Sequence, residues 1–473
     1  MTSLSAPVVS TSDGVDARDP DRRLSSLLDP DSAVALGPAD GCGVIRVTGR
    51  IDGAPVVAFC TDATSMGGAL GAAGADRIVQ AIDVALRHHW PVVGLWHCGG
   101  ARLADGVESM DGAGRMFRAM SAASGRIPQI SVVVGPAAGA AAYGPALTDF
   151  IVMSDAARIF VTGPDVVRTV TGENIDMIGL GGPDTHGSRS GVAHVTVKSE
   201  PEAYRTTRAL VGYLARPGVV DLARLGAAPD PSATLPESPR RAYNVVPLVR
   251  ALLDDGEFLQ IQPRWARNIT VGFGRLAGRA VGVVANNPIH KGGCLDSLAA
   301  EKAARFVRTC DALGVPLLVP VDVPGYLPGV DQEWGGVVRR GAKLLHAFSE
   351  AVVPRITLIT RKSYGGAYLA MNSRPLGASA VFAWPGAEVA IMSAEAAVNV
   401  LHRRALAAAG ADELPGLRAR LIAEQRHEAG GLDRALSLGA VDEVVEPAAT
   451  RACLARALAD LPARHGTHGN IPL

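Results

Sequence analysis

The chain carries one sequence pattern twice, with the second copy 225 residues after the first. Gly49 and Arg50 recur as Gly274 and Arg275, and the match continues without a gap. Further pairs are Gly53 with Gly278, Val56 with Val281, Gly67-Gly68 with Gly292-Gly293, Leu70 with Leu295, and Pro91 with Pro316; after one residue of drift, Pro128, Ile130 and Gly139 match Pro354, Ile356 and Gly365. Solenoid repeats are only about 20–50 residues long. The repeated unit is therefore a whole domain, and the chain is predicted to contain one fold twice.

Each copy has the same order of predicted elements. A hairpin around a glycine is followed by a Gly-Gly loop, a helical stretch, and two apolar runs that each begin after a proline. Strands and helices alternate and the strands are unbroken apolar runs, which is typical of a parallel or mixed sheet covered by helices. The predicted fold class is therefore α/β, twice. The expected domains are residues 1–240 and 241–473, joined by a proline-rich linker over about 215–240.

Charge balance limits the partners of this chain. The 46 basic and 46 acidic side chains cancel, so the chain lacks the positive field expected of a protein that binds nucleic acid or an anionic membrane. We expect small-molecule and protein partners, with no nucleic acid and no membrane. The uncharged run 127–148 is long enough to span a bilayer, but three prolines interrupt it, so it is predicted to be buried core.

The cysteines and the N-terminus indicate a cytoplasmic protein. None of the six cysteines forms a C-x-x-C pair, so neither a zinc cluster nor a disulfide framework is predicted, and no metal is expected. The first residues contain no apolar stretch of the kind found in secretory signals.

Two segments rich in small residues, 132–150 and 358–378, are the strongest functional signal. In each, a predicted strand ends and a Gly-Ala run leads into a helix, so that a ligand can approach the backbone N–H groups closely. Such donors can form an oxyanion hole. Small residues also allow a helix to pack tightly on a sheet, but their recurrence after the same strand in both copies favours a functional role.

A second pair of loops, 97–107 and 322–330, follows the preceding strand of each copy. Gly100 and Gly325 each lie nine residues after the proline that opens that strand. Ligands of parallel α/β sheets collect beyond the carboxyl ends of the strands, where these loops are expected. An ordinary turn would use glycine and proline as well.

Several common catalytic motifs are missing. The sequence has no GxxxxGK[ST] loop, no HExxH and no GxSxG, and the glycines of 272–278 have the wrong spacing for a dinucleotide fingerprint. His97 and Cys98 could form a nucleophile pair, but no third group that would orient them is evident.

The motifs together resemble a known family. GGARLADGV, PQISVVVGPAAGAAAYGPALTDF, FVTGPDVVRTVTGE, SGVAH and the long stretch from CLDSLAAEKAARF to KSYGGAY are similar to the carboxyltransferase (β) subunit of biotin-dependent acyl-CoA carboxylases. The actinobacterial type is the most similar, in particular the mycobacterial subunit that supplies malonyl-CoA for fatty and mycolic acid synthesis. The resemblance implies two tandem crotonase-like (ClpP/crotonase) domains related by internal duplication, which agrees with the repeat.

The resemblance also implies a reaction. Carboxybiotin, carried on a separate biotinylated α subunit, gives CO2 to the α-carbon of acetyl-CoA or propionyl-CoA, forming malonyl-CoA or methylmalonyl-CoA. This chain lacks the Met-Lys-Met sequence to which biotin is attached, so biotin must come from that partner. The family implies self-association as a dimer or hexamer. The first domain would be the acyl-CoA side and the second the biotin side.

Site residues follow from the matched motif positions. The resemblance assigns Gly139 and Ala140 to the oxyanion hole that faces the acyl-CoA, and Gly366 and Ala367 to the one that faces biotin. It further assigns Gly99, Gly100, Ala101 and Leu369 to substrate binding, and Gly325, Tyr326 and Gly365 to biotin binding.

The sequence departs from the family pattern at three positions. Cys98 replaces the usual Ser, and Ala140 replaces a Gly, but neither change removes a backbone donor. Leu369 stands where propionyl-type subunits often carry Asp. A larger apolar side chain there would reshape the acyl pocket, so acetyl-CoA is the expected main substrate, with propionyl-CoA also accepted.

Three alternatives stay open at this point. A biotin-dependent acyl-CoA decarboxylase subunit would share the fold and run the half-reaction backwards. A non-catalytic acyl-CoA-binding subunit would not need both Gly-Ala motifs intact. A crotonase-type hydratase would need a catalytic acid, and no glutamate lies beside the glycine motifs.

Overall fold

The computed structural model describes residues 16–38, 40–226, 229–238, 241–428 and 431–472. The chain forms two compact units, which are described separately below. The first comprises Met1–Pro217, Ile261–Trp265 and Thr467–Pro472, and the second comprises Gly218–Gln260, Ala266–Gly466 and Leu473. This division differs from the expected domains because residues 218–240 belong to the second unit, whereas two short segments of the second half belong to the first.

The first unit is built on a mixed sheet. Its strands are β1 (Val34–Ala35), β2 (Val44–Ile51), β3 (Ala54–Thr61), β4 (Val92–Cys98), β5 (Gln129–Ala138), β6 (Phe150–Met153), β7 (Arg158–Phe160) and β8 (Val195–Thr196). Their order is β1-β2-β3-β4-β5-β6-β8, and β7 pairs with the end of β5. The β1, β2 and β3 strands are antiparallel neighbours, and the pairings from β3 onward are parallel.

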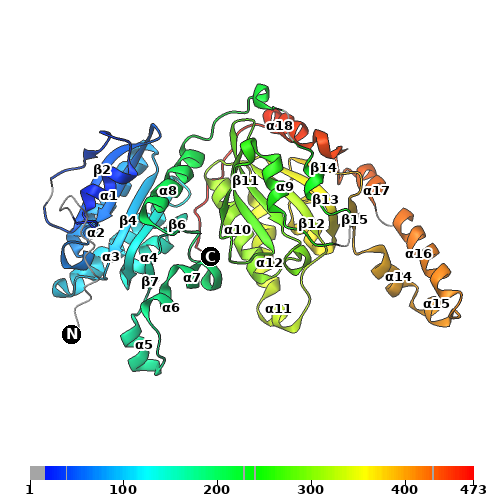
Figure 1. Ribbon diagram of the computed structural model, residues 1–473, viewed down its shortest axis with the longest axis horizontal. Helices are drawn as coiled ribbons and strands as arrows, with labels where there is room; N and C mark the ends of the chain where they lie inside the picture. Colours follow the sequence, from blue (N-terminus) through cyan, green and yellow to red (C-terminus); the bar gives the residue numbers. More distant parts are fainter. Residues whose placement is uncertain (1–15, 39, 227–228, 239–240, 429–430, 473) are drawn as a thin grey trace. The chain divides into compact units, whose positions relative to one another are not determined.

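The first unit also contains helices. They are α1 (Pro20–Leu27), α2 (Ala72–His88), α3 (Val107–Ala123), α4 (Ala140–Ala146), α5 (Pro164–Thr171), α6 (Met177–Gly181), α7 (Pro183–Thr185) and α8 (Glu200–Ala215). The α5, α6 and α7 helices form an insertion between β7 and β8, and α5 projects away from the strands (Figure 1).

The second unit repeats this plan. Its strands are β9 (Leu259–Ile261), β10 (Ile269–Leu276), β11 (Arg279–Asn286), β12 (Leu317–Val323), β13 (Arg355–Tyr364), β14 (Ala380–Ala383), β15 (Glu388–Ala390) and β16 (Glu443–Val444). They lie in the order β16-β14-β13-β12-β11-β10-β9, and β15 pairs with β13 as β7 does with β5.

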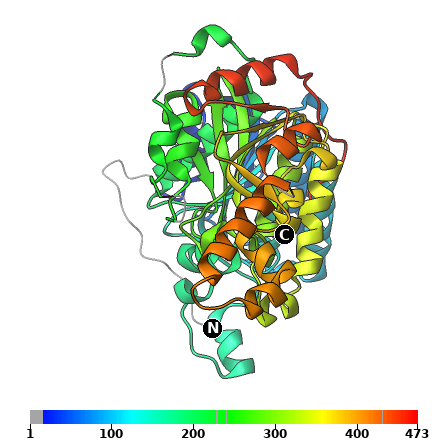
Figure 2. The same ribbon diagram turned by 90° about the vertical axis from the view of Figure 1, so that its right-hand side faces the viewer.

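The helices of the second unit include a longer insertion. They are α9 (Val246–Leu252), α10 (Ser297–Ala312), α11 (Val330–Trp334), α12 (Val337–Glu350), α13 (Gly365–Ala370), α14 (Ala394–Leu401), α15 (Arg403–Ala408), α16 (Leu414–Glu428), α17 (Leu432–Ser437) and α18 (Thr450–Asp460). The α14 to α17 helices separate β15 from β16. In Figure 1 the α14, α15 and α16 helices project beyond the strands, and Figure 2 shows this insertion, in orange, from its outer side.

The duplication is visible in the backbone itself. The β2, β3 and β4 strands recur as β10, β11 and β12 at the same separation of 225 residues that the sequence shows. Even the left-handed residues recur, because Gly68 (φ +75°) corresponds to Gly293 (φ +78°) and Gly139 (φ +59°) to Gly365 (φ +58°). The predicted α/β fold, present twice, is confirmed.

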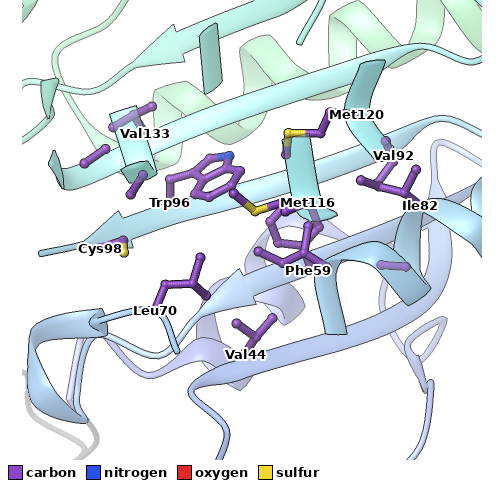
Figure 3. Packing of buried hydrophobic residues seen from close by; sticks show 14 of the residues in the cluster. Val44, Phe59, Leu70, Ile82, Val92, Trp96, Cys98, Met116, Met120 and Val133 are labelled. Atoms are coloured by element: carbon purple, nitrogen blue, oxygen red, sulfur yellow. The ribbon is translucent and has the colours of Figure 1, made fainter. Parts of the chain in front are cut away.

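The core of the first unit lies between the sheet and the α2 and α3 helices. Ile78 and Ile82, one helical turn apart on α2, are fully buried in the same hydrophobic cluster as Phe59 and Trp96 of the sheet. Figure 3 shows Ile82, Phe59 and Trp96 within this cluster. The rings of Phe59 and Trp96 meet edge to face with centroids 5.3 Å apart, an arrangement favoured by the ring quadrupoles.

The uncharged run 127–148 forms β5 and α4, and most of its residues are buried in this unit. This agrees with the prediction that it is core. Among the described residues, no helix is both long and apolar enough to cross a membrane.

Candidate active site

The loop after β4 is held by a single bridge to the segment before α2. The N–H of Leu70 donates to the Gly100 carbonyl, and the N–H of Arg102 donates to the Leu70 carbonyl, both at 2.9 Å. In a parallel bridge of this kind, the residue between the two bonded groups directs its own N–H to the opposite side. That residue is Ala101, so its amide is free to meet a ligand.

The same bridge recurs after β12. Leu295 donates to the Gly325 carbonyl at 3.0 Å and accepts from the N–H of Leu327 at 2.7 Å, and Tyr326 is the residue between. Its side chain packs onto α12, since a Cβ added at Gly341 would lie 3.1 Å from the Tyr326 hydroxyl. Burial raises the pKa of Tyr326 to about 12. Tyr326 therefore offers its backbone N–H to the site, and its phenol is not a base.

The first small-residue motif begins α4. β5 ends at Ala138, Gly139 adopts φ +59° and ψ −126°, and the helix starts at Ala140. The N–H of Gly139 donates to the Phe160 carbonyl of β7 at 3.0 Å. The amides of Ala140 and Ala141 lie in the first helical turn, where no earlier carbonyl is in helical register to accept them. Of the expected pair Gly139 and Ala140, only Ala140 has an N–H available for a ligand.

The second small-residue motif begins α13. Gly365 has φ +58°, like Gly139, so Gly366 is the counterpart of Ala140 and Ala367 the counterpart of Ala141. The expected pairs Gly139–Ala140 and Gly366–Ala367 are therefore offset by one residue from each other. Sequence reasoning missed Ala141, although the equivalence of the two left-handed glycines could have indicated it.

Each loop lies beside the helix start of its own unit, because β4 pairs with β5 and β12 with β13 up to their ends. The last register pairs are Cys98 with Ala137 and Val323 with Ser363. A Cβ added at Gly100 would lie 3.6 Å from the Ala138 carbonyl oxygen. The loop and the helix start therefore lie at the same end of the sheet in each unit.

Two further residues expected in the substrate site, Gly99 and Leu369, lie in different surroundings. Gly99 donates its N–H to the Gly67 carbonyl at 3.0 Å, so it is a structural part of the loop. Leu369 lies on α13 with 42% of its surface exposed.

His97 and Cys98 do not form a nucleophile pair. Burial raises the pKa of the Cys98 thiol to about 11, which keeps it protonated. Burial and the Arg23 guanidinium lower the pKa of His97 to about 4, and its Nδ1 lies 3.4 Å from Arg23. Arg23 is itself paired with Glu200 at 2.9 Å. This arrangement supports a structural role for His97 and Cys98. The sequence had suggested the same, because it shows no third group that would orient them.

Gly68 shows how closely the loop is packed. A Cβ there would lie 2.0 Å from the His97 carbonyl oxygen, and its φ of +75° is strained for any other residue. We expect Gly68→Ala to lower the free energy of unfolding by about 3 kcal/mol, measured by denaturant titration. Gly114→Ala is the matched control: this helical glycine has nothing within 4 Å, so the change should stabilise by about 1 kcal/mol. Equal stability of the two variants would contradict the packing.

The second unit also contains a cavity of about 370 Å³ that the sequence did not indicate. It lies between β15 and the insertion helices, and most of its wall is apolar. The lining residues are Glu388, Ala390, Ile391, Met392, Ala394, Ala397, Val400, Leu401, Gln425 and Gly431. The Ile391 carbonyl oxygen lies 2.9 Å from a Cβ added at Gly365, so the cavity adjoins the start of α13.

No cluster of three or more metal-binding side chains occurs within the described part of the chain. The candidate donors of the two sites are the backbone amides described above. The arrangement can hold two negatively charged oxygens, one in each unit.

Comparison with known proteins identifies the family. The model of the carboxyl transferase domain matches residues 32–465. The biotin-dependent acetyl-/propionyl-coenzyme A carboxylase β6 subunit of Mycobacterium tuberculosis is 57% identical over the full length of both chains. The propionyl-CoA carboxylase β chain of Rhodococcus erythropolis is 55% identical, also over both full lengths.

Comparison with solved structures supports the same family. The transcarboxylase 12S hexamer, solved with methylmalonyl-coenzyme A and methylmalonic acid bound, superposes with a TM-score of 0.89 and is 38% identical, covering 96% of this chain and 92% of its own. This confirms the crotonase-like α/β fold and the resemblance read from the motifs. The chain therefore belongs to the carboxyl transferase domain family, and it is an enzyme component that acts in carboxyl transfer.

Proposed function

We propose that this chain is the carboxyltransferase subunit of an acetyl-/propionyl-CoA carboxylase and forms malonyl-CoA or methylmalonyl-CoA. The observation that carries the proposal is the pair of matching amide sites, Ala101 with Ala140 in the first unit and Tyr326 with Gly366 in the second. The names of the relatives support the same reaction class.

The first site suits an acyl-CoA thioester. Removal of the α-proton places negative charge on the thioester oxygen, and the amides of Ala101 and Ala140 would donate to it. Fixed donors of this kind are each worth about 3–4 kcal/mol in the transition state because they need no reorganisation. The first unit would thus be the acyl-CoA side.

The second site suits the ureido oxygen of biotin. Gly366 is exposed, with nothing within 4 Å of a Cβ added there, so a planar ring can approach its N–H. When bound, carboxybiotin supplies the CO2, and its released ureido nitrogen can take the α-proton, so the protein needs no base of its own. The amides of Gly366 and Tyr326 would stabilise the charge on the ureido oxygen. The second unit would thus be the biotin side.

The proposal includes partners. A biotinylated α subunit would bring the carrier, and this chain would self-associate, with the first unit of one copy serving the second unit of another. The hexamer named for transcarboxylase 12S supports an oligomeric arrangement. A cytoplasmic location fits reduced cysteines.

Reconstitution tests this function. The purified chain, a biotinylated α subunit, ATP and labelled bicarbonate should convert acetyl-CoA and propionyl-CoA to labelled products. Label incorporation that needs no α subunit, or none with either thioester, would contradict the proposal. Decarboxylation of malonyl-CoA without ATP-driven carboxylation would instead favour the decarboxylase alternative.

Substrate preference is a further prediction of this proposal. Leu369 lies on α13 of the biotin-side unit, so it would meet the acyl group where the first unit of one copy serves the second unit of another. We therefore expect kcat/KM for acetyl-CoA to exceed that for propionyl-CoA by about tenfold, since one methylene is worth only about 1–3 kcal/mol. Leu369→Asp, which changes an exposed side chain, should shift the ratio toward propionyl-CoA. A clear preference of the unmodified chain for butyryl-CoA would refute the pocket argument.

A further inference from the structure

Tyr364 and Glu388 form a hydrogen bond at the edge of the second site. Tyr364 is the last residue of β13, directly before Gly365 and Gly366, and only 5% of its surface is exposed. Its hydroxyl donates to Oε2 of Glu388, the first residue of β15. The bond therefore joins the two strands that end beside α13.

The backbone around this bond explains what it could control. β15 runs parallel to the end of β13, with Lys362 opposite Glu388 and Tyr364 opposite Ala390. The next residue, Ile391, places its carbonyl oxygen 2.9 Å from a Cβ added at Gly365. The left-handed turn at Gly365 thus rests on the segment that follows β15. A shift of β15 would move this turn and, with it, the amide of Gly366.

The same strand forms one wall of the 370 Å³ cavity. Glu388, Ala390 and Ile391 line it, and Glu388 is its one charged lining residue within the described part of the chain. The bond to Tyr364 therefore holds a carboxylate at the boundary between an apolar cavity and the amide site.

The first unit shows that the fold does not require this bond. There, β7 pairs with the end of β5 in the same way, with Pro136 opposite Arg158 and Ala138 opposite Phe160. Ala138 takes the place of Tyr364, and Arg158 takes the place of Glu388. Arg158 donates to the Asp155 and Ala157 carbonyls, each at 2.6 Å. In the first unit this strand pairing forms without a side-chain hydrogen bond between the two strands. The pairing in the second unit therefore does not require the bond between Tyr364 and Glu388.

We propose that Tyr364 and Glu388 are a positioning pair, present only in the second copy, that holds the Gly366 amide in place for the biotin-side reactant. The inference rests on the proposed function and adds two residues to it. Neither side chain donates to the reacting atoms: they act by fixing β15 against β13.

Tyr364→Phe removes the hydroxyl and keeps the ring. The assay is the reverse transfer from malonyl-CoA to free biotin, in which the malonyl C–C bond breaks, a C–N bond forms, and the ureido proton moves to the α-carbon. We expect kcat/KM for biotin to fall about tenfold, which corresponds to about 1.4 kcal/mol. The KM for malonyl-CoA should not change, because its site lies in the first unit.

Partner variants test whether the two residues act together. Glu388→Ala should reproduce the defect, and Glu388→Gln, which keeps an acceptor oxygen, should restore most of kcat/KM for biotin. The double variant Tyr364→Phe, Glu388→Ala should be no worse than either single one, since both remove the same bond. Additive losses would overturn the pairing.

Tyr204→Phe is the matched control. Tyr204 is also 5% exposed, and its hydroxyl also donates to a glutamate, Glu200, but it lies on α8 of the first unit. It should leave the KM for biotin unchanged. Thermal unfolding of every variant separates loss of fold from loss of positioning.

The outcomes separate the two proposals. An unmodified chain that transfers no carboxyl group contradicts the proposed function. If the unmodified chain is active, two results for Tyr364→Phe overturn the positioning pair alone. One is an unchanged kcat/KM for biotin, and the other is an equal fall in kcat/KM for biotin and for malonyl-CoA.

Discussion

Replacement of Gly366 by proline is expected to lower kcat for carboxyl transfer by about 100- to 1,000-fold. Proline has no backbone N–H, so the substitution deletes the proposed donor to the ureido oxygen. The fold should tolerate it, because Gly366 is the second residue of α13, where an N–H has no helical partner. Steady-state kinetics with the biotinylated α subunit, with circular dichroism to check the fold, gives the measurement.

Gly366→Ala is the matched control for that loss. Nothing lies within 4 Å of a Cβ added at Gly366, and its φ is not in the left-handed range. Alanine keeps the N–H, so kcat should stay within about threefold of the unmodified chain, a difference of less than 1 kcal/mol. If the alanine and proline variants lose activity equally, the lost N–H is not the cause. A proline variant that stays fully active would favour a non-catalytic role for this motif.

Replacement of Ala140 by proline is expected to have a similar effect in the first unit. Ala140 is the first residue of α4, the helical position at which proline is most easily accommodated. Its N–H is the proposed donor to the thioester oxygen. The N–H of Gly139 cannot replace it, because it donates to the Phe160 carbonyl. We expect kcat to fall by about 100- to 1,000-fold in the same assay.

Ala140→Gly keeps the donor and should retain most of the activity. The Gly366→Pro and Ala140→Pro variants should also differ in their effect on the KM for free biotin. Since Ala140 serves the acyl-CoA side, its loss should not change the KM for free biotin in the reverse reaction. An Ala140→Pro chain with normal kcat would show that the thioester oxygen is held elsewhere.

The fold could be predicted from the sequence because the same residues recur at equivalent positions of the two copies, including glycines that the backbone conformation requires. Glycine pairs such as Gly68 and Gly293 recur where both copies need a left-handed residue. A close contact forbids any side chain at these places, so the glycines persist in both copies and reveal the register. The loops and helix starts could therefore be placed before the structure was known.

The details of the donors could not be predicted in the same way. Which N–H of the first motif is free depends on β7, a strand of only three residues that begins 19 residues after the left-handed Gly139. Its pairing with β5 occupies the amide of Gly139. Short strands bury too few residues to leave a periodic pattern, so this competition was invisible in the sequence.

The limits of the two units also escaped prediction, for a related reason. Two short segments from the second half contact the first unit through a few polar groups of the backbone and side chains. Gln262 donates its backbone N–H to the His194 carbonyl at 2.7 Å, and Asn470 donates its side-chain amide to Asp149 at 3.0 Å. A few hydrogen bonds hold such a segment in place, but an isolated Gln or Asn in the sequence does not indicate which residues it will bond.

The central claim is that backbone amides of Ala101 and Ala140 hold the thioester oxygen. A crystal structure of the chain with acetyl-CoA measures this directly. The account predicts that the thioester oxygen lies about 2.7–3.1 Å from both amide nitrogens. A thioester oxygen bound to a side chain or to water, with neither amide within hydrogen-bonding distance, would contradict it.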